Sequence, residues 1–130
     1  MRTYMDDTIR GCPIGDVADL MFNRWTAPIL WGLHHHGSMR FNELQRFLVD
    51  ITPKVLTTRL RQLERDGLVI RRCVTDVPQR VEYEISELGR SLRPVFRTLD
   101  RWGATHLTAI AAARSEYDRL QAEEAAWAEG

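Results

Sequence analysis

The sequence predicts a mainly helical α+β fold in which several helices accompany one small β-hairpin. Two observations lead to this prediction. Apolar residues recur at helical spacing over most of the chain, and residues 68–85 are typical of a hairpin, with clear two-residue alternation at 81–85. With 130 residues the chain is long enough to bury one continuous core, so we expect a single domain over residues 1–130.

The composition is that of an ordinary globular protein, with 44% hydrophobic and 28% charged residues. No apolar run reaches the roughly 20 residues of a membrane span, and the N-terminus lacks the apolar segment of a signal peptide. We therefore expect a cytoplasmic protein with no membrane partner. The two cysteines are far apart and lack CxxC spacing, so we expect free thiols.

A formal net charge of zero hides an uneven distribution. Residues 52–80 carry seven basic and three acidic side chains, whereas residues 114–130 carry two basic and five acidic ones. DNA responds to the local field of a protein surface, so the basic segment is the one that bears on nucleic-acid binding.

Three helices are expected before residue 50. The first covers about residues 14–22, with Val17, Leu20 and Met21 as its apolar stripe. The second runs from about residue 25 to 36 and is stopped by Gly37. A short extended segment at residues 39–41 precedes the third helix, for which we expect Asn42 as the N-cap. In this helix we expect the Gln45 side chain to reach back to the cap. Leu44, Phe47 and Leu48 are expected to form its buried face.

The fourth helix has the clearest boundaries. Thr52 is expected to cap it, Pro53 suits its first position, and Gly67 follows its end. A helical projection gathers the leucines at 56, 60 and 63 on one side. The opposite side carries Lys54, Thr58, Arg61 and Arg65, with Thr57 beside them.

Two strands, residues 68–74 and 81–85, are expected to form a hairpin with a polar tip. Glu82 and Glu84 share one strand face and have basic neighbours, which is typical of surface ion pairs. From about Glu87 we expect a long helix with a continuous apolar stripe. Gly103 is expected to bend it before a final Ala-rich helix at about residues 105–127.

This order of elements is that of a winged helix-turn-helix fold, in which the fourth helix enters a major groove of double-stranded DNA. Threonines near its N-terminus suit close approach to base edges, and its cations can donate hydrogen bonds to guanine. An ordinary solvated helix would show the same pattern alone, and the element order is what favours DNA. The candidate recognition residues are Thr52, Lys54, Val55, Thr57, Thr58 and Arg61.

The hairpin supplies further cations near its tip, which suit contacts with phosphates or the minor groove. These charges could equally keep a short edge hairpin in solution. Arg59, on the flank of the fourth helix, is either a phosphate contact or part of a structural ion pair. The candidate wing and phosphate residues are Arg40, Arg59, Arg71, Arg72, Gln79 and Arg80.

Several motifs in fixed order resemble the HxlR family of bacterial winged helix regulators, which are related to the MarR group. They are CP at residues 12–13, RWT at 24–26, RFNEL at 40–44, ITPKVLT at 51–57, RLRQLERDGL at 59–68, VPQRVEY at 77–83 and LGRSL at 88–92. The resemblance covers about residues 11–103 and leaves residues 104–130 as a C-terminal helical extension. Asn23-Arg24 replaces the Gly-Lys pair that is usual in the family.

The resemblance implies a homodimer on a palindrome-like operator, usually acting as a repressor. It also implies that the first helix and the long fifth helix supply N- and C-terminal dimerisation helices. The expected interface residues are Val17, Leu20, Met21, Leu92, Val95, Phe96, Leu99 and Trp102. In several family members a cysteine in the place of Cys12 senses oxidants or electrophiles, although Cys12 could also be a packed thiol.

Other functional classes find little support. The three consecutive histidines at 34–36 diverge around a helix and cannot meet at one ion, so no metal or other cofactor is expected. The chain lacks the Gly-rich phosphate loop and the nucleophile motifs of common enzymes, so we do not expect it to be an enzyme. Two alternatives remain. One is a small-molecule effector that binds near Trp25 or Trp102, and the other is a protein-interaction module that has lost DNA binding.

Overall fold

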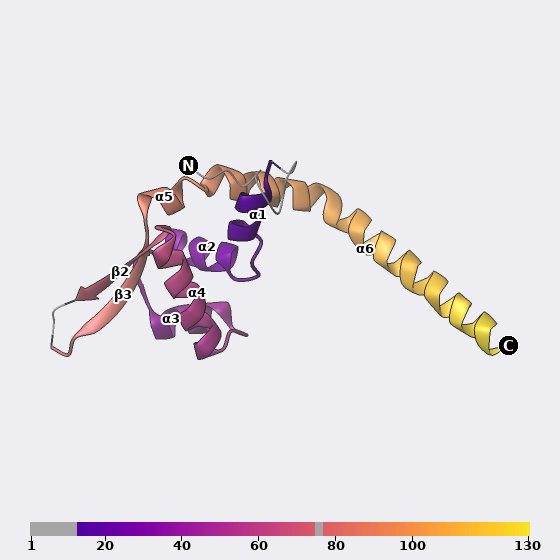
Figure 1. The fold of residues 1–130 in the computed structure, drawn as a ribbon, viewed down its shortest axis with the longest axis horizontal. Coiled ribbons are helices and arrows are strands. Elements are labelled where there is room, and N and C mark those ends of the chain that lie inside the picture. Colours follow the sequence, from indigo (N-terminus) through magenta and orange to yellow (C-terminus); the bar gives the residue numbers. More distant parts are fainter. Residues whose placement is uncertain (1–12, 75–76) are drawn as a thin grey trace. The chain divides into compact units, whose positions relative to one another are not determined.

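The computed structural model describes residues 13–74 and 77–130, which fall into two compact units, one up to Leu92 and one from Arg93 onward. Figure 1 shows the elements in chain order and labels all of them except β1. They are α1 (Gly15–Met21), α2 (Thr26–His36), β1 (Met39–Arg40), α3 (Phe41–Leu48), α4 (Pro53–Arg65), β2 (Val69–Val74), β3 (Arg80–Ile85), α5 (Glu87–Arg90) and α6 (Arg93–Glu129).

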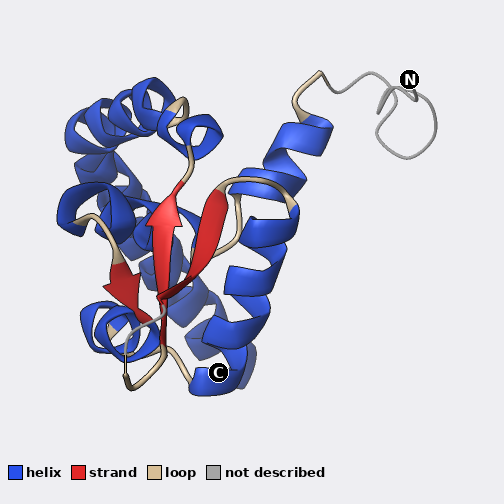
Figure 2. Cartoon of the chain, turned by 90° about the vertical axis from the view of Figure 1, so that its left-hand side faces the viewer, coloured by secondary structure: helices blue, strands red, loops and turns tan. Residues whose placement is uncertain are grey.

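The expected winged helix fold is confirmed: helices predominate, and one small antiparallel sheet has the strand order β1-β3-β2. Figure 2 shows the three strands side by side. In the hairpin, Val69 is opposite Ile85 and Cys73 is opposite Val81. The short extended segment before α3 joins the sheet as a third strand, with Met39 opposite Tyr83. None of the described helices has the length and apolar character needed to cross a membrane.

The core of the first unit is built from the apolar stripes that the helical spacing predicted. Leu33 of α2, Leu44 of α3 and Leu60 of α4 are each at most 1% exposed. Phe47 was expected on the buried face of α3, and that expectation is wrong because its side chain is 38% exposed. Its ring packs edge-on against His36 and covers Gly32, so Phe47 lies at the margin of the core.

The start of α3 also differs from the prediction. The N-cap is Arg40, and the backbone N–H of Arg40 donates to Glu43 Oε1 at 2.8 Å, a role that the sequence had assigned to Asn42 and Gln45. Pairing of Met39 and Arg40 with β3 ends the extended segment at Arg40, so the helix begins at once with Phe41. Tertiary strand pairing therefore decides the boundary.

The long helix expected from residue 87 to a bend at Gly103 is divided elsewhere. The break lies at Ser91 and Leu92, between α5 and α6, and α6 then runs without interruption through Gly103 to Glu129. Pro94 explains the break, since proline lacks an N–H and its ring would clash with the carbonyl four residues earlier. Glycine costs a helix interior only about 1 kcal/mol, which α6 tolerates over 37 residues.

Candidate nucleic-acid interface

A tight turn joins α3 to α4 and fixes the angle between them. Val49 adopts φ 63°, in the left-handed region that a β-branched residue rarely occupies. The backbone N–H of Asp50 donates to the carbonyl of Leu48 at 2.7 Å across this residue. Ile51 then returns to the core at 4% exposure, so the turn is anchored on both sides.

The N-terminus of α4 is formed as the sequence predicted. Thr52 is the N-cap, and its Oγ1 accepts a hydrogen bond from the backbone N–H of Val55 at 3.2 Å. Pro53 fills the first helical position, where no N–H is needed. The first turn contains no acidic residue, so nothing there offsets the partial positive charge of the helix end, and Lys54 adds a full charge.

The two faces of α4 are separated as expected. Leu56, Leu60 and Leu63 are at most 4% exposed. The polar residues on the other side of the helix are exposed: Lys54, Thr58, Arg61 and Arg65. Val55 and Thr57 are half-buried at the boundary between the faces. The leucine side therefore holds the helix in place while a row of cations faces outward.

Thr58 is restricted in the hydrogen bonds that it can offer. Its hydroxyl donates to the carbonyl of Lys54 at 3.0 Å, one turn earlier in the helix. The proton is thus directed at the helix backbone, while the oxygen of Thr58 keeps its lone pairs for a donor. The adenine and cytosine amino groups of the major groove are donors of that kind.

The wing arginines differ in how free they are. Arg72 Nε lies 2.7 Å from Glu84 Oε1, and Arg80 Nε lies 3.1 Å from Glu82 Oε2. These contacts confirm that Glu82 and Glu84 are surface ion-pair partners. Arg71 and Gln79 are exposed, and among the described residues Arg71 takes part in no ion pair. Arg71 is therefore the wing cation with the least competition for an external anion.

Two other predicted phosphate contacts lie apart from the exposed row of α4. Arg40 is exposed at the junction of β1 and α3. Arg59 is only partly exposed, and its Nη1 donates to Gln62 at 2.7 Å. Its Nε is buried without a partner among the described residues, beside a pocket that Asp19 and Asn23 also line. Arg59 thus faces the α1 side of α4.

The expected interface residues are not equally accessible. Val17, Val95, Leu99 and Trp102 are between 43% and 53% exposed, whereas Leu20, Leu92 and Phe96 are half-buried. Met21 is only 4% exposed within the chain, so it contributes to the core of the first unit. Of the two cysteines, Cys73 is exposed on β2, and Cys12 lies outside the described residues.

A helix-turn-helix with a capped, cationic second helix and a β-hairpin wing defines the winged helix class of DNA-binding proteins. Comparison with known proteins gives the family. The model of the HxlR-like helix-turn-helix family matches residues 20–111, so the chain belongs to that family. It is a transcriptional regulator with a helix-turn-helix fold for DNA binding. The family and the individual relatives described next are regulators, not enzymes.

Individual relatives support the assignment over most of the chain. The chain is 36% identical to the uncharacterized HTH-type transcriptional regulator YdeP of Bacillus subtilis, over 90% of this chain and 93% of that protein. Among solved structures, it resembles the HTH-type transcriptional regulator ytcD at TM-score 0.69 and 40% identity, covering 75% of this chain and 98% of ytcD. It resembles the redox regulator HypR in its reduced form at TM-score 0.70 and 33% identity, covering 78% and 99%.

Proposed function

We propose that the chain is a homodimeric repressor that inserts α4 into the major groove of a palindrome-like operator. The observation that carries the proposal is the division of α4 into a buried leucine face and an exposed row with Lys54 and Arg61. A two-fold dimer would place two such helices about 34 Å apart, in successive major grooves on one side of the duplex. Occupying a promoter in this way blocks transcription.

The binding test begins with selection of preferred duplexes from a random pool by the full chain. Affinity for the selected site and for a scrambled duplex is then measured by fluorescence anisotropy at several salt concentrations. We expect Arg61→Ala to weaken the selected site by about 1–3 kcal/mol and the scrambled duplex far less. Arg90→Ala removes the same charge from an exposed position of α5 and serves as the matched control. Equal losses on both duplexes for Arg61→Ala would contradict base recognition.

A second measurement tests whether the β2–β3 hairpin, the wing, contacts the phosphates of DNA. Arg71 and Arg72 are adjacent on β2, but Arg72 is held by Glu84 at 2.7 Å. A phosphate must compete with this carboxylate for Arg72, whereas no carboxylate among the described residues pairs with Arg71. We expect Arg71→Ala to reduce affinity on both duplexes and to lower the salt slope by about one charge, with a smaller effect for Arg72→Ala. Unchanged binding of Arg71→Ala would remove the wing from the interface.

We also propose that an oxidant controls the regulator through Cys12. Support comes from HypR, a redox regulator solved in reduced and oxidised forms, and from the position of Cys12 before the first helix in the sequence. Cys12→Ser is expected to keep DNA affinity and to lose its response to diamide, whereas Cys73→Ser keeps both. Cys73 is the matched control because its thiol is exposed on β2. A full diamide response of Cys12→Ser would exclude this role.

A further inference from the structure

The pocket that lies between α1 and α4 has no role in the function proposed so far. We call it the α1–α4 pocket, and its volume is about 260 Å³. Liquid water takes about 30 Å³ per molecule, so this volume has room for a ligand of roughly nine non-hydrogen atoms. Most of the residues that line the pocket are polar or charged, including Asp19, Asn23, Arg59, Gln62, Arg65 and Asp66. A small polar molecule therefore suits the pocket better than an apolar one.

Arg59 supplies the pocket with a guanidinium group whose donors are only partly used. Its Nη1 donates to Gln62 Oε1 at 2.7 Å. Its Nε is buried and has no partner among the described residues. A charged donor that is shielded from water and left without an acceptor destabilises a protein. An acceptor that reached Nε would remove this cost, so the pocket favours a ligand that carries one.

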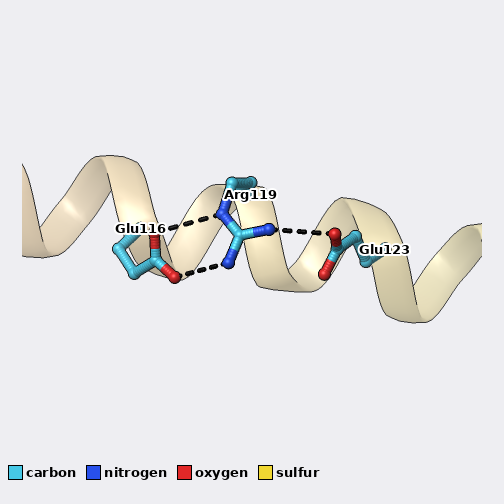
Figure 3. Close-up of polar contacts among 3 residues, drawn as sticks. All are labelled: Glu116, Arg119 and Glu123. Carbon is cyan, nitrogen blue, oxygen red and sulfur yellow. Dashed lines mark hydrogen bonds and ion pairs between the residues drawn. The ribbon is translucent and has the colours of Figure 1, made fainter.

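Arg119 in α6 shows which acceptor suits the Nε side of a guanidinium group (Figure 3). Its Nε and Nη2 donate to the two carboxylate oxygens of Glu116 at 3.1 Å and 2.6 Å, while its Nη1 donates to Glu123 at 2.9 Å. Arg59 makes the equivalent Nη1 bond, to Gln62. Its Nε lies on the side that binds a carboxylate in Arg119. A carboxylate is therefore the group that the Nε side of Arg59 is suited to bind.

The pocket also contains two carboxylates, which belong to Asp19 of α1 and to Asp66, the C-cap of α4. Both side chains are exposed, and neither forms an ion pair with another described residue. The C-terminal end of a helix carries a partial negative charge, which adds to the charge of Asp66. These groups attract a cation and repel a second carboxylate. A small molecule with one carboxylate and one ammonium group therefore matches both parts of the pocket.

We propose that the α1–α4 pocket binds a free amino acid, whose carboxylate binds Arg59 and whose ammonium group is attracted to Asp19 and Asp66. An amino acid with about four non-hydrogen atoms in its side chain fills the volume of the pocket. A ligand held by Arg59 and Asp19 joins α4 to α1, so its binding is coupled to the position of α4. The amino acid thereby regulates DNA binding, and this second part rests on the function proposed above.

Binding is measured on the full chain without DNA, by isothermal titration calorimetry with each of the twenty common L-amino acids. We expect at least one of them to bind with a Kd below about 1 mM. The amide of that amino acid lacks the carboxylate, and its N-acetyl derivative lacks the ammonium group. Each derivative should bind about tenfold or more weakly than the amino acid itself. Absence of binding for all twenty at about 10 mM, or equal binding of the amide, would overturn the proposal.

Two variants locate the bound amino acid. Arg59→Lys keeps the positive charge but loses the paired donors, and Asp19→Asn removes one carboxylate; each should raise the Kd about tenfold or more. Arg90→Lys in α5 and Asp100→Asn in α6 make the same changes at exposed positions outside the pocket and should alter the Kd less than about twofold. Circular dichroism should show that all four variants keep the helix content of the wild type. A wild-type Kd in Arg59→Lys would overturn the proposed site.

The regulatory part is tested by fluorescence anisotropy on the selected duplex. A saturating concentration of the amino acid should change the affinity of the wild type about threefold or more and that of Arg59→Lys less. An unchanged wild-type affinity would refute the regulation. If an amino acid binds but no duplex is bound in a sequence-dependent way, the DNA proposal is refuted and the binding site stands. If the duplex is bound but none of the twenty amino acids is, the binding site is refuted and the regulator function stands.

Discussion

Gly89 in α5 offers the sharpest test of packing at the base of the wing. A Cβ added there would lie 2.6 Å from Cγ1 of Ile85, and closer still to the carbonyl oxygen of Leu68. Ile85 and Leu68 are 5% and 3% exposed, and the Leu68 carbonyl already accepts the N–H of Ser86 at 3.0 Å. Neither atom can withdraw without disturbing the start of β2 or the end of β3.

The cost of Gly89→Ala follows from these distances. Overpacking of this kind costs about 1–3 kcal/mol, and a backbone oxygen as the obstacle places the cost near the upper end. Alanine in a helix regains about 1 kcal/mol over glycine. We therefore expect a net loss of about 1–2 kcal/mol in the free energy of unfolding.

Urea unfolding of the full chain, followed by circular dichroism at one fixed protein concentration, measures this loss. A fixed concentration is needed because dimerisation would make apparent stability depend on it. Arg90→Ala, at the next and exposed position, should stay within about 0.5 kcal/mol of wild type. If Gly89→Ala unfolds at the wild-type urea concentration or above, the close approach of α5 to the sheet is not real.

Three further effects can be measured on the same chain. Thr52→Ala removes the acceptor for the Val55 N–H and should cost about 1 kcal/mol in urea unfolding, while Thr52→Ser should be neutral. An unchanged Thr52→Ala would mean that the cap is not formed. Leu60→Ala empties a site that is 1% exposed and should cost about 2–5 kcal/mol in the same assay. A loss below about 1 kcal/mol would contradict its burial. Hydrogen bonds from Arg119 lower the pKa of Glu116 from its ordinary 4.5, so their stabilisation is present above that pH and is lost as the pH falls through the lowered value. Helix content on acidification should therefore fall less in Glu116→Gln than in wild type, and identical profiles would contradict the pairing.

Much of the candidate site could be predicted because its signals are local. Thr52 and Pro53 are adjacent to the helix that they start, and the leucines of α4 lie three or four residues apart. Such short-range patterns fix a helix, its cap and its buried face together. The outward position of Lys54 and Arg61 then follows from the burial of the leucines.

The predictions differ from the structure where residues far apart in the sequence determine the local backbone. The start of α3 depends on pairing between Met39 and Tyr83, which are far apart in the sequence. The left-handed backbone at Val49 has no sequence signal, since valine is a poor residue for it. Pro94, in contrast, is a local signal for the break before α6. The apolar residues on both sides of it keep helical spacing, and that spacing predicts one continuous helix.

The leucines of α4 bear on function as much as on stability. A helix that lies in a groove must present the same side chains to every duplex, and rotation by one residue would turn Arg61 about 100° away. Leu56 and Leu60, at 0% and 1% exposure, oppose that rotation because it would expose them to water. The selectivity proposed for Lys54 and Arg61 therefore depends on side chains that touch no DNA.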